Sequence, residues 1–408
     1  MRVLLVIDQF DDANNGTTVS ARRLAHALHG RGNEVRVVCC RGDGTEARAL
    51  PSGATDGIVR YLLEPLRIPG FNGIISGQGM VLARADDEVL RDALGWADVA
   101  HFMLPFWLGV RGKRLADALR VPSTAAFHVQ PENITYSVGV GRVGPLNEAV
   151  YAVFRPFYNR FRHVHCPSEF IAQELRAHGY RAALHVVSNG VDPSFAPRAL
   201  PRRADLADRF VVTMTGRLSH EKRQDVLIDA VRQSRYADRI QLVLAGRGPL
   251  DERYRKQGAT LPHPPMIGFF AQEALRDVLA MSDLYVHAAD AEIEAIGCME
   301  AFASGLVPVI SDSRASATGQ FALDERSLFR AGDPADLARA IDYWLEHDDE
   351  RATMGLAYAE AAKALGLDGS VAQIEAMMRQ AITETRFAAA AGPLPALPDD
   401  VEGAAYEQ

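Results

Sequence analysis

Short apolar runs that alternate with amphipathic helical stretches constrain this chain more than any other feature of its sequence. The first run covers residues 3–7, and a polar loop separates it from Leu24, Ala25 and Leu28, which recur at helical spacing. Two glycines end the helical pattern before the next apolar run at residues 35–39. Runs of this length are typical of buried parallel strands joined by crossover helices. The start of the chain therefore predicts a βαβ unit.

The same alternation continues and then begins again after a proline-rich segment. Strand-like runs follow at residues 99–103, 124–127 and 164–166, and three prolines between residues 191 and 203 indicate a linker. Beyond the linker, apolar runs recur at residues 210–214, 241–245, 266–269, 284–287 and 307–310. We therefore predict an α/β protein of two doubly wound, Rossmann-like domains that face each other across a cleft.

The length of the chain, 408 residues, fits two such domains. We predict an N-terminal domain over residues 1–192 and a C-terminal domain over residues 193–386, whose final helix can return to the first domain. Residues 387–408 are rich in alanine and proline and hold few large apolar side chains. We expect a disordered tail there.

The net charge of −8 is unevenly distributed along the chain. Residues 1–200 carry a net charge of +3, and residues 201–408 carry −11. The N-terminal half is therefore the one expected to meet an anionic surface. An acidic chain is a poor partner for nucleic acid, and we expect no nucleic-acid partner.

Cellular location and redox state can be predicted from the start of the chain and from its cysteines. No run of about 18 apolar residues occurs, and the apolar start reaches Asp8 too soon for a signal peptide. None of the four cysteines forms a CxxC pair, which favours reduced thiols in the core over disulfides or zinc. We expect a cytoplasmic protein, attached peripherally to the inner face of the cell membrane if its partner is a lipid.

The loops that follow strands are the candidate site, because ligands of doubly wound sheets bind beyond the carboxyl ends of the strands. Gly16 lies between the first strand and the first helix, where a glycine allows close approach of the backbone and a helix N-terminus favours an anion. A plain turn glycine is the alternative. The loop lacks GxGxxG, which argues against an NAD-dependent oxidoreductase.

Two cations occupy the loop after the first strand of the second domain. Arg217 and Lys222 lie in the segment TGRLSHEK, just before a predicted helix. A planar guanidinium and a point-charge ammonium suit a diphosphate, while solvated surface charge is the alternative. No two aspartates in the chain are separated by a single residue, the arrangement through which many enzymes hold a nucleotide diphosphate by way of a metal. We therefore expect neither a metal nor a cofactor, and we assign phosphate neutralisation to these two cations.

Two glutamates flank a predicted loop-to-helix segment of the second domain. If that segment is helical throughout, Glu292 and Glu300 lie about 12 Å apart along the axis. This exceeds the roughly 5–9.5 Å between the paired carboxyl groups of glycoside hydrolases, but it suits the two ends of one long ligand. Glu294 is an alternative to Glu292, and ordinary surface glutamates are the alternative to both roles.

Histidines accompany two predicted strands of the first domain. His128 follows an apolar run, where it can donate a hydrogen bond to a sugar or phosphate or serve as a satisfied structural histidine. His163 and His165 alternate along a strand, but no third ligand lies nearby in the sequence. We therefore expect no metal site at this pair.

Seven segments together resemble glycosyltransferase family 4, the retaining enzymes with the GT-B fold. In chain order they are NNGTTVS, AAFHVQ, CPSEF, SNGVD, GRLSHEK, LAGRGPL and the stretch from Glu292 to Glu300 with EAFASGLVPVI behind it. The resemblance extends to about residue 387. It implies a GT-B fold and the transfer of a sugar from a nucleotide sugar.

The resemblance also implies which residues bind the donor. Arg217 and Lys222 would bind the donor diphosphate, and Glu300 would bind the ribose hydroxyls. Gly16 would let the first loop approach the donor phosphate and the acceptor. Phe269 lies where the backbone of family members typically meets the base.

By the same resemblance, Glu292 positions the transferred sugar, and His128 contacts that sugar and the reacting centre. The family retains anomeric configuration through a front-face mechanism, in which the departing phosphate helps to deprotonate the acceptor, so we assign no general base. One departure is that Ala295 stands where the family commonly has glycine, and Gly297 follows two residues later. Glu294 therefore stays a candidate for the carboxylate that faces the sugar.

Three segments, FHVQPENITY, HCPSEF and SATGQFALDERSLF, resemble bacterial family members that glycosylate diacylglycerol. Residues 151–162 interleave five aromatic residues with Arg155, Arg160 and Arg162, as expected of a segment that lies on anionic lipid. Pro156 argues against an unbroken helix there, and a buried aromatic cluster is the alternative.

We therefore expect transfer of a hexose to a membrane lipid such as 1,2-diacylglycerol at an anionic membrane surface, with glucose from UDP-glucose as the leading donor candidate. A family member that acts on a soluble or polysaccharide acceptor is the closest alternative. An NAD-dependent oxidoreductase and a non-catalytic sugar- or lipid-binding protein are the alternatives from other classes. A pure binding protein has no need of a diphosphate clamp.

Overall fold

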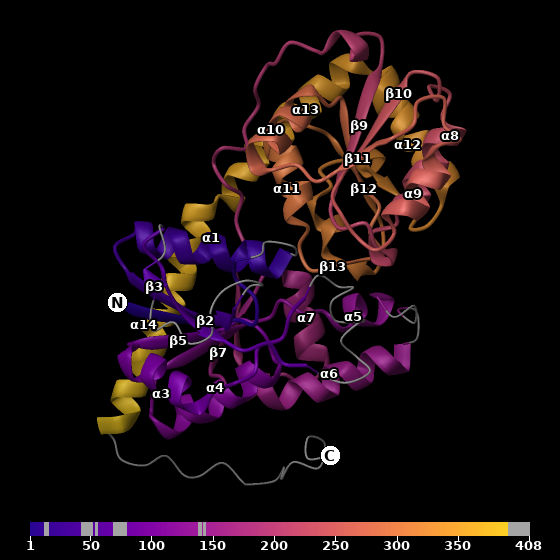
Figure 1. The fold of residues 1–408 in the computed structure, drawn as a ribbon. Helices are drawn as coiled ribbons and strands as arrows, with labels where there is room; N and C mark the ends of the chain where they lie inside the picture. Colours follow the sequence, from indigo (N-terminus) through magenta and orange to yellow (C-terminus); the bar gives the residue numbers. More distant parts are fainter. Residues whose placement is uncertain are drawn as a thin grey trace.

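The computed structural model describes residues 1–11, 16–41, 52–53, 56–67, 80–137, 141 and 144–390. Within them two α/β lobes stack on each other, and the last helix leaves the second lobe and runs along the first (Figure 1). We call the first sheet with its helices the N-terminal lobe, and the second sheet with its helices the C-terminal lobe.

The N-terminal lobe is built on a sheet whose described strands follow the order β3-β4-β2-β1-β5-β6-β7-β8. Neighbouring strands are parallel except β3 and β4, which are antiparallel. The strands are β1 (Arg2–Val6), β2 (Glu34–Cys40), β3 (Ser52–Gly53), β4 (Val59–Leu63), β5 (Val99–Phe102), β6 (Ser123–Ala126), β7 (His163–Cys166) and β8 (Ala183–Val186). β1 is central, because its Leu5 pairs with Val37 on one side and with His101 on the other.

The C-terminal lobe contains a parallel sheet with the strand order β11-β10-β9-β12-β14-β16 among the described residues. These strands are β9 (Phe210–Thr215), β10 (Ile240–Ala245), β11 (Met266–Gly268), β12 (Leu284–His287), β14 (Pro308–Ser311) and β16 (Leu328–Phe329). A separate short pair, β13 (Ala291–Glu292) and β15 (Ala315–Ser316), is also parallel and lies on the side that faces the N-terminal lobe (Figure 1).

Helices cover both sheets. They are α1 (Gly16–Gly30), α3 (Asp87–Trp96), α4 (Trp107–Ala118), α5 (Pro131–Ser137), α6 (Gly144–Tyr158), α7 (Glu169–Ala177), α8 (Gln224–Gln233), α9 (Asp251–Gly258), α10 (Gln272–Met281), α11 (Ile296–Ala303), α12 (Pro334–Glu346), α13 (Asp348–Ala362) and α14 (Leu367–Ala390). The local sequence explains where α12 begins. The Asp333 side chain accepts from the N–H groups of Ala335 and Asp336, and Pro334 occupies the first turn of α12.

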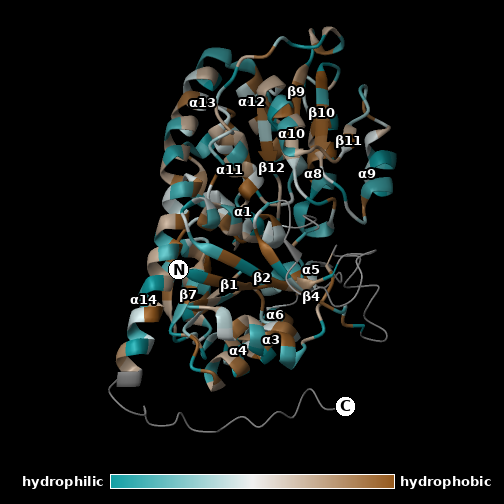
Figure 2. Ribbon diagram, turned by 60° about the vertical axis from the view of Figure 1, so that its left-hand side comes forward, coloured by the Kyte–Doolittle hydropathy of each residue, from teal (hydrophilic) through white to brown (hydrophobic). Residues whose placement is uncertain are grey.

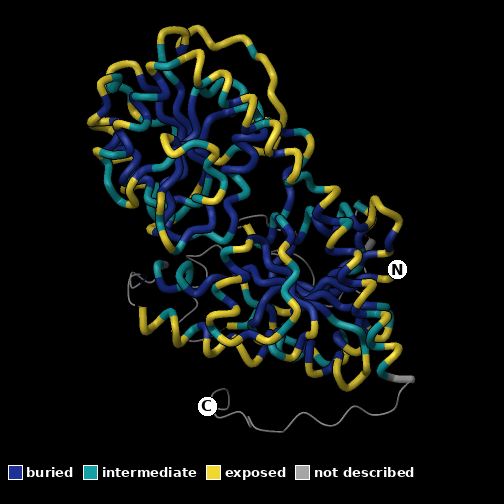
Figure 3. Tube along the Cα trace, turned by 180° about the vertical axis from the view of Figure 1, so that it is seen from behind, coloured by how far each residue is buried: buried dark blue, intermediate teal, exposed yellow. Residues whose placement is uncertain are grey.

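Both sheets are buried by the helices that cover them. Every residue of β10, β12 and β14 is buried, and so is every residue of β5 and β7. The inner strands of each sheet are accordingly apolar and buried (Figures 2 and 3). Burial on two faces explains why these strands read as continuous apolar runs in the sequence.

The last helix, α14, returns to the N-terminal lobe. Val371, Met377 and Met378 join the core of that lobe, and Arg31 of α1 donates to Glu375 of α14 at 2.9 Å. α14 continues to residue 390, past residue 387 where the disordered tail was predicted to begin, because alanine extends a helix readily. The rest of the predicted tail, residues 391–408, lies outside the described residues.

Residues 151–162 do not present their aromatic side chains to a membrane. All five are buried in the N-terminal lobe, namely Tyr151, Phe154, Phe157, Tyr158 and Phe161. The interpretation of this segment as an interfacial aromatic surface is therefore wrong, and the alternative of a buried cluster is correct. Helix α6 includes Pro156 near its end. Two of the three arginines form ion pairs, Arg160 with Asp117 at 2.8 Å and Arg162 with Glu384 at 2.9 Å.

The predicted α/β fold with two doubly wound sheets is confirmed. The predicted runs match β1, β2, β5, β6, β7, β9, β10, β11, β12 and β14 to within about a residue. Strands β4, β8 and β16 were not predicted. The side chains of β8 are exposed or half-buried, so this strand leaves no apolar run in the sequence. Among the described residues, no helix is long and apolar enough to cross a bilayer.

Candidate active site

The loops at the carboxyl ends of the strands meet where the two lobes face each other. The Ser168 hydroxyl donates to the carbonyl of Ile293 at 2.8 Å, and the Gln130 side-chain amide donates to the carbonyl of Ala315 at 2.8 Å. Helix α5 also contacts the short 3-10 helix η2 (His220–Lys222) of the C-terminal lobe. The loops after β6 and β7 therefore lie directly against the segments that carry the predicted donor site.

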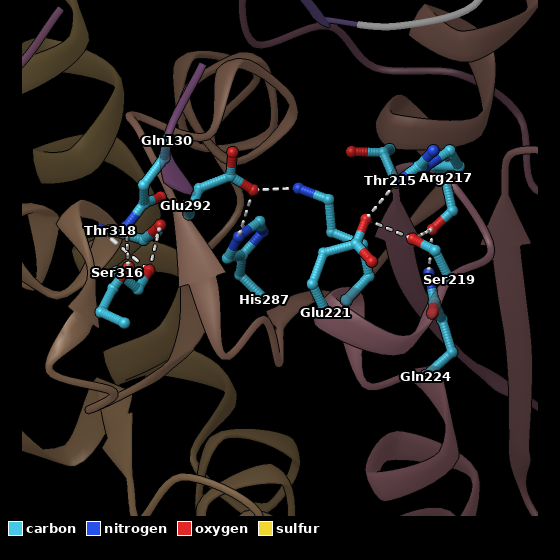
Figure 4. A network of polar contacts seen from close by, with 12 residues as sticks. Gln130, Thr215, Arg217, Ser219, Glu221, Gln224, His287, Glu292, Ser316 and Thr318 are labelled. Atoms are coloured by element: carbon cyan, nitrogen blue, oxygen red, sulfur yellow. Dashed lines mark hydrogen bonds and ion pairs between the residues drawn. The ribbon is translucent and has the colours of Figure 1, made fainter. Parts of the chain in front are cut away.

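Arg217 is held in place by a buried carboxylate of its own loop. Its Nη2 donates to Glu221 Oε1 at 2.8 Å, and the Ser219 hydroxyl donates to the same oxygen (Figure 4). Burial opposes ionisation of Glu221, but the charges of Arg217 and Lys222 outweigh it and lower the pKa of that carboxyl. The guanidinium is thus positioned by a carboxylate behind it.

Lys222 and Glu292 form a half-buried ion pair between the loop after β9 and strand β13. The Lys222 ammonium donates to Glu292 Oε2, and His287 Nε2 lies 3.4 Å from the same oxygen (Figure 4). Burial opposes ionisation of Glu292, but the charge of Lys222 outweighs it and lowers the pKa to about 2. The structure therefore brings two sequence-predicted residues into direct contact as ammonium and carboxylate.

Glu294 binds Asn189, which lies just before the linker. Its Oε2 accepts from the backbone N–H of Asn189 at 2.9 Å and from the Asn189 side-chain amide at 2.7 Å. Burial raises the pKa of Glu294 to about 7. These contacts give Glu294 an evident structural role and leave Glu292 as the carboxylate beside Lys222.

The segment between Glu292 and Glu300 is not helical throughout, as the estimate of their separation assumed. It runs from strand β13 through a left-handed turn at Ala295 into helix α11. Glu300 is buried on that helix and accepts from Arg23 Nη2, on α1 of the other lobe, at 2.5 Å. Burial raises the pKa of Glu300 even though the Arg23 charge opposes this shift.

The turn at Ala295 explains why glycine is favoured at this position. Ala295 has φ 69° and ψ 66°, a left-handed conformation that costs an alanine more than a glycine. Two residues on, a Cβ at Gly297 would stand 2.0 Å from the Thr215 hydroxyl, so only glycine fits there. Ala295 offers α11 no side-chain cap, and in the first turn the N–H of Cys298 donates to the Ala295 carbonyl at 2.9 Å. Such a helix start is suited to bind an anion.

Phe269 lies in the open at the end of β11. Its side chain is 57% exposed, and the Arg247 guanidinium stands over the ring at 5.2 Å from its centroid. A Cβ at Gly246 would come within 1.9 Å of the Gly216 carbonyl oxygen, so the loops after β9 and β10 touch backbone to backbone. An exposed aromatic ring with a guanidinium over it suits a planar, aromatic nucleobase.

Gly16 and His128 lie close together in the N-terminal lobe. Gly16 is the first residue of α1, and the hydroxyl of the next residue, Thr17, donates to the His128 carbonyl at 3.4 Å. Residues 12–15, in the loop before Gly16, lie outside the described residues. The His128 ring is buried, with the His165 ring centroid 5.5 Å away. Burial, and then the neighbouring His165 and His101, lower the pKa of His128 well below its usual value, so the imidazole is neutral.

Two family models cover most of the chain. Residues 14–195 match the model described as Glycosyltransferase Family 4, and residues 200–360 match the one described as Glycosyl transferases group 1. A GDP-mannose-dependent alpha-mannosyltransferase of Mycolicibacterium smegmatis is 30% identical over 327 residues, which are 76% of this chain and 79% of that protein. The chain belongs to glycosyltransferase family 4. The prediction of a retaining glycosyltransferase is therefore confirmed, and the NAD-dependent oxidoreductase is excluded.

Other relatives of this family 4 glycosyltransferase differ in their named substrates. A GDP-mannose-dependent alpha-mannosyltransferase of Corynebacterium glutamicum is 28% identical, over 76% of this chain and 72% of that protein. An alpha-monoglucosyldiacylglycerol synthase of Streptococcus pneumoniae is 24% identical, over 52% of this chain and 51% of that protein.

Solved structures confirm the GT-B fold of the glycosyltransferase. Sucrose-phosphate synthase of Thermosynechococcus elongatus superposes with a TM-score of 0.74 at 18% identity, covering 94% of this chain and 99% of that one. The Anabaena protein HepE, crystallised with UDP-glucose, gives a TM-score of 0.70 at 19% identity, covering 95% and 100%.

Several polar residues at the site of this glycosyltransferase were not predicted. Arg23 lies next to residues whose helical spacing marked only the buried face of α1, so its contact with Glu300 left no signal in the sequence. Arg247 lies within LAGRGPL, one of the segments that carried the resemblance, and could have been singled out there. Among the described residues, no cluster of His, Cys, Asp and Glu side chains could hold a metal ion.

Proposed function

We propose that this glycosyltransferase transfers a hexose, with retention of configuration, from a nucleotide diphosphate sugar to a membrane lipid. The observation that carries the proposal is a set of four charges that are largely enclosed by protein, in the loop after β9 and on β13. In it Arg217 is backed by the buried Glu221, and Lys222 is paired with Glu292 (Figure 4). A helix start without a side-chain cap lies in the same lobe, at Ala295. Two cations and a helix N-terminus match the charge of a diphosphate.

The remaining predicted residues take roles along the length of such a donor. Glu300, buried on α11, accepts from the ribose hydroxyls, and exposed Phe269 meets the base. Glu292 accepts from a hydroxyl of the hexose, and the neutral His128 imidazole hydrogen-bonds the hexose near the reacting carbon. Gly16 brings the start of α1 to the donor phosphate, where the helix N-terminus favours negative charge.

The charges provide the chemistry of the transfer. The bond between the anomeric carbon and the diphosphate oxygen breaks, and the acceptor oxygen bonds to the same face of that carbon. The departing phosphate oxygen takes the proton of the acceptor hydroxyl, while Arg217 and Lys222 stabilise the negative charge that grows on the phosphate. As Lys222 turns from Glu292 to the phosphate, the ionised carboxylate becomes available to a sugar hydroxyl.

GDP-mannose is the donor that the relatives support best, because both named GDP-mannose-dependent enzymes match over more than two thirds of their length. UDP-glucose is the second candidate. It is supported by the resemblance of three sequence segments to diacylglycerol glycosyltransferases, and by the shorter match to the alpha-monoglucosyldiacylglycerol synthase.

The aromatic residues of 151–162 are buried and do not support a lipid acceptor. An apolar outer face on the N-terminal lobe supports it instead. Leu146 and Val153 are 39% and 59% exposed and lie two turns apart on the same side of α6. Trp107, at the start of α4, is 44% exposed, and its neighbour Phe106 packs against Phe154 of α6 at 6.2 Å between ring centroids. Both helices lie on the side of this lobe remote from the C-terminal lobe (Figure 1).

The proposal is tested with purified enzyme, radiolabelled GDP-mannose or UDP-glucose, and diacylglycerol vesicles with and without phosphatidylglycerol. We expect one donor to be consumed, a labelled lipid of retained configuration, and unchanged activity in excess chelator. Val153→Asp should reduce co-sedimentation with anionic vesicles, whereas Leu356→Asp, at a 66% exposed position of the C-terminal lobe, should not. Labelling of water-soluble acceptors alone would establish the soluble-acceptor alternative.

A further inference from the structure

The ion pair between Arg23 and Glu300 joins the two lobes at the position assigned to the donor ribose. Arg23 belongs to α1 of the N-terminal lobe, and Glu300 belongs to α11 of the C-terminal lobe. Nη2 lies 2.5 Å from Oε1, and the two side chains are only 14% and 7% exposed. A pair so short and so enclosed is a specific contact rather than a loose surface attraction.

The pair leaves the guanidinium incompletely satisfied. Arg23 Nη1 is buried and has no hydrogen-bond partner among the residues that the structure describes. Asp192, at the start of the linker, interacts electrostatically with Arg23, and its carboxylate accepts from the N–H of Ser194 at 2.9 Å. The unused N–H and the nearby Asp192 carboxylate give the guanidinium a second partner to which it can turn when its pair with Glu300 is broken.

Occupation of Glu300 by Arg23 has a consequence for donor binding. The ribose hydroxyls need the oxygens of the Glu300 carboxylate, and Arg23 already donates to one of them. We propose that Arg23 is a competitive latch: it closes the empty enzyme by holding Glu300 across the lobes, and the ribose of the donor displaces it. This inference rests on the proposed function, because it takes Glu300 as the residue that binds ribose.

The latch gives each partner a defined state before and after the donor enters. Without nucleotide, Arg23 satisfies a carboxylate that would otherwise be buried without a partner. With nucleotide, the two ribose hydroxyls take over Glu300, and Arg23 turns to Asp192. The free energy needed to break the Arg23–Glu300 pair therefore weakens the binding of every ligand that carries both ribose hydroxyls. It does not affect ligands that lack them.

Calorimetry with GDP, UDP and their 2′,3′-dideoxy forms tests the latch. For whichever base binds, Arg23→Gln should bind the ribonucleotide at least threefold more tightly than the wild type and leave the dideoxynucleotide unchanged. Arg23→Lys, which keeps the positive charge, should remain close to the wild type. Arg22→Gln is the matched control, because it removes one positive charge from the same helix. Arg22 donates to the Asp11 carbonyl and not to Glu300.

A Glu300→Gln variant separates the failure of the latch from the failure of the proposed function. If Glu300→Gln weakens ribonucleotide binding while Arg23→Gln leaves it unchanged or weakens it, the latch is wrong and the ribose site stands. If Glu300→Gln binds both nucleotide forms like the wild type, Glu300 does not hold ribose, and both proposals are overturned. Tighter binding of the dideoxynucleotide by Arg23→Gln also contradicts the latch.

Discussion

At the scale of single residues, the site contains a backbone conformation that is unfavourable for the residue that adopts it. Ala295 adopts a left-handed conformation between Glu292 and helix α11, and no side chain caps the helix that follows. Glycine adopts this conformation without the steric conflict between Cβ and the backbone. The conformation persists because β13 and α11 fix the backbone on both sides of it.

Ala295→Gly should therefore raise the free energy of unfolding, by about 1 kcal/mol, although glycine normally destabilises. Urea titration measures the change. Ala152→Gly, on the exposed face of helix α6, should lower the free energy of unfolding by roughly 0.5–1 kcal/mol. A loss of stability in both variants would mean that the turn at Ala295 is not strained.

Two glutamates two residues apart should differ in how their contributions to stability depend on pH between pH 5 and 7.5. Burial raises the folded pKa of Glu294 from 4.5 to about 7, so its contribution to stability is complete below about pH 4.5 and is lost as the pH rises through 7. The wild type should thus gain stability relative to Glu294→Gln as the pH falls from 7.5 to 5. Glu292, with a pKa lowered to about 2, is ionised in the folded state throughout this range. Glu292→Gln should therefore show no such trend above pH 5, and denaturant titrations across the range provide the comparison.

Elements could be predicted from the sequence wherever burial left an apolar run. All predicted strands except β11, whose residues are half-buried, are mostly buried strands of the two sheets, and their parallel pairing agrees with a doubly wound fold. The mostly buried β4 was missed, because Arg60 interrupts its apolar residues. Strand β8 escaped prediction because its side chains are not buried, and β13 because two residues carry no periodicity. The left-handed turn at Ala295 was not predicted either, since an alanine in the sequence does not indicate a positive φ.

Helix α14 should be essential to the N-terminal lobe although it is the last described helix of the chain. Met378 is completely buried in the core of that lobe, so Met378→Ala should cost about 2–5 kcal/mol of unfolding free energy. Gln373→Ala, at an exposed position of the same helix, should cost less than about 0.5 kcal/mol. Similar small losses in both variants would show that α14 does not complete the lobe.

At the scale of the whole molecule, the site forms only where residues from both lobes meet. The donor-binding roles of Arg217, Lys222 and Glu292 came from the resemblance and remain predictions, and their mutual contacts became visible only in the structure. The contact between Arg23 and Glu300 joins residues 277 positions apart in the chain. A local sequence pattern cannot predict such a contact, because the contact depends on how the two lobes are arranged relative to each other.

The central claim, that Arg217 and Lys222 hold the donor diphosphate, is tested most directly by steady-state donor turnover. We expect Arg217→Gln and Lys222→Gln to lower kcat/KM at least tenfold, since losing a hydrogen bond to a charged group costs about 1.5–3 kcal/mol. Arg232→Gln should leave turnover unchanged, because Arg232 lies exposed on α8 with Asp229 as its partner. Values of kcat/KM within twofold of the wild type for both Arg217→Gln and Lys222→Gln, with the fold intact, would contradict the account.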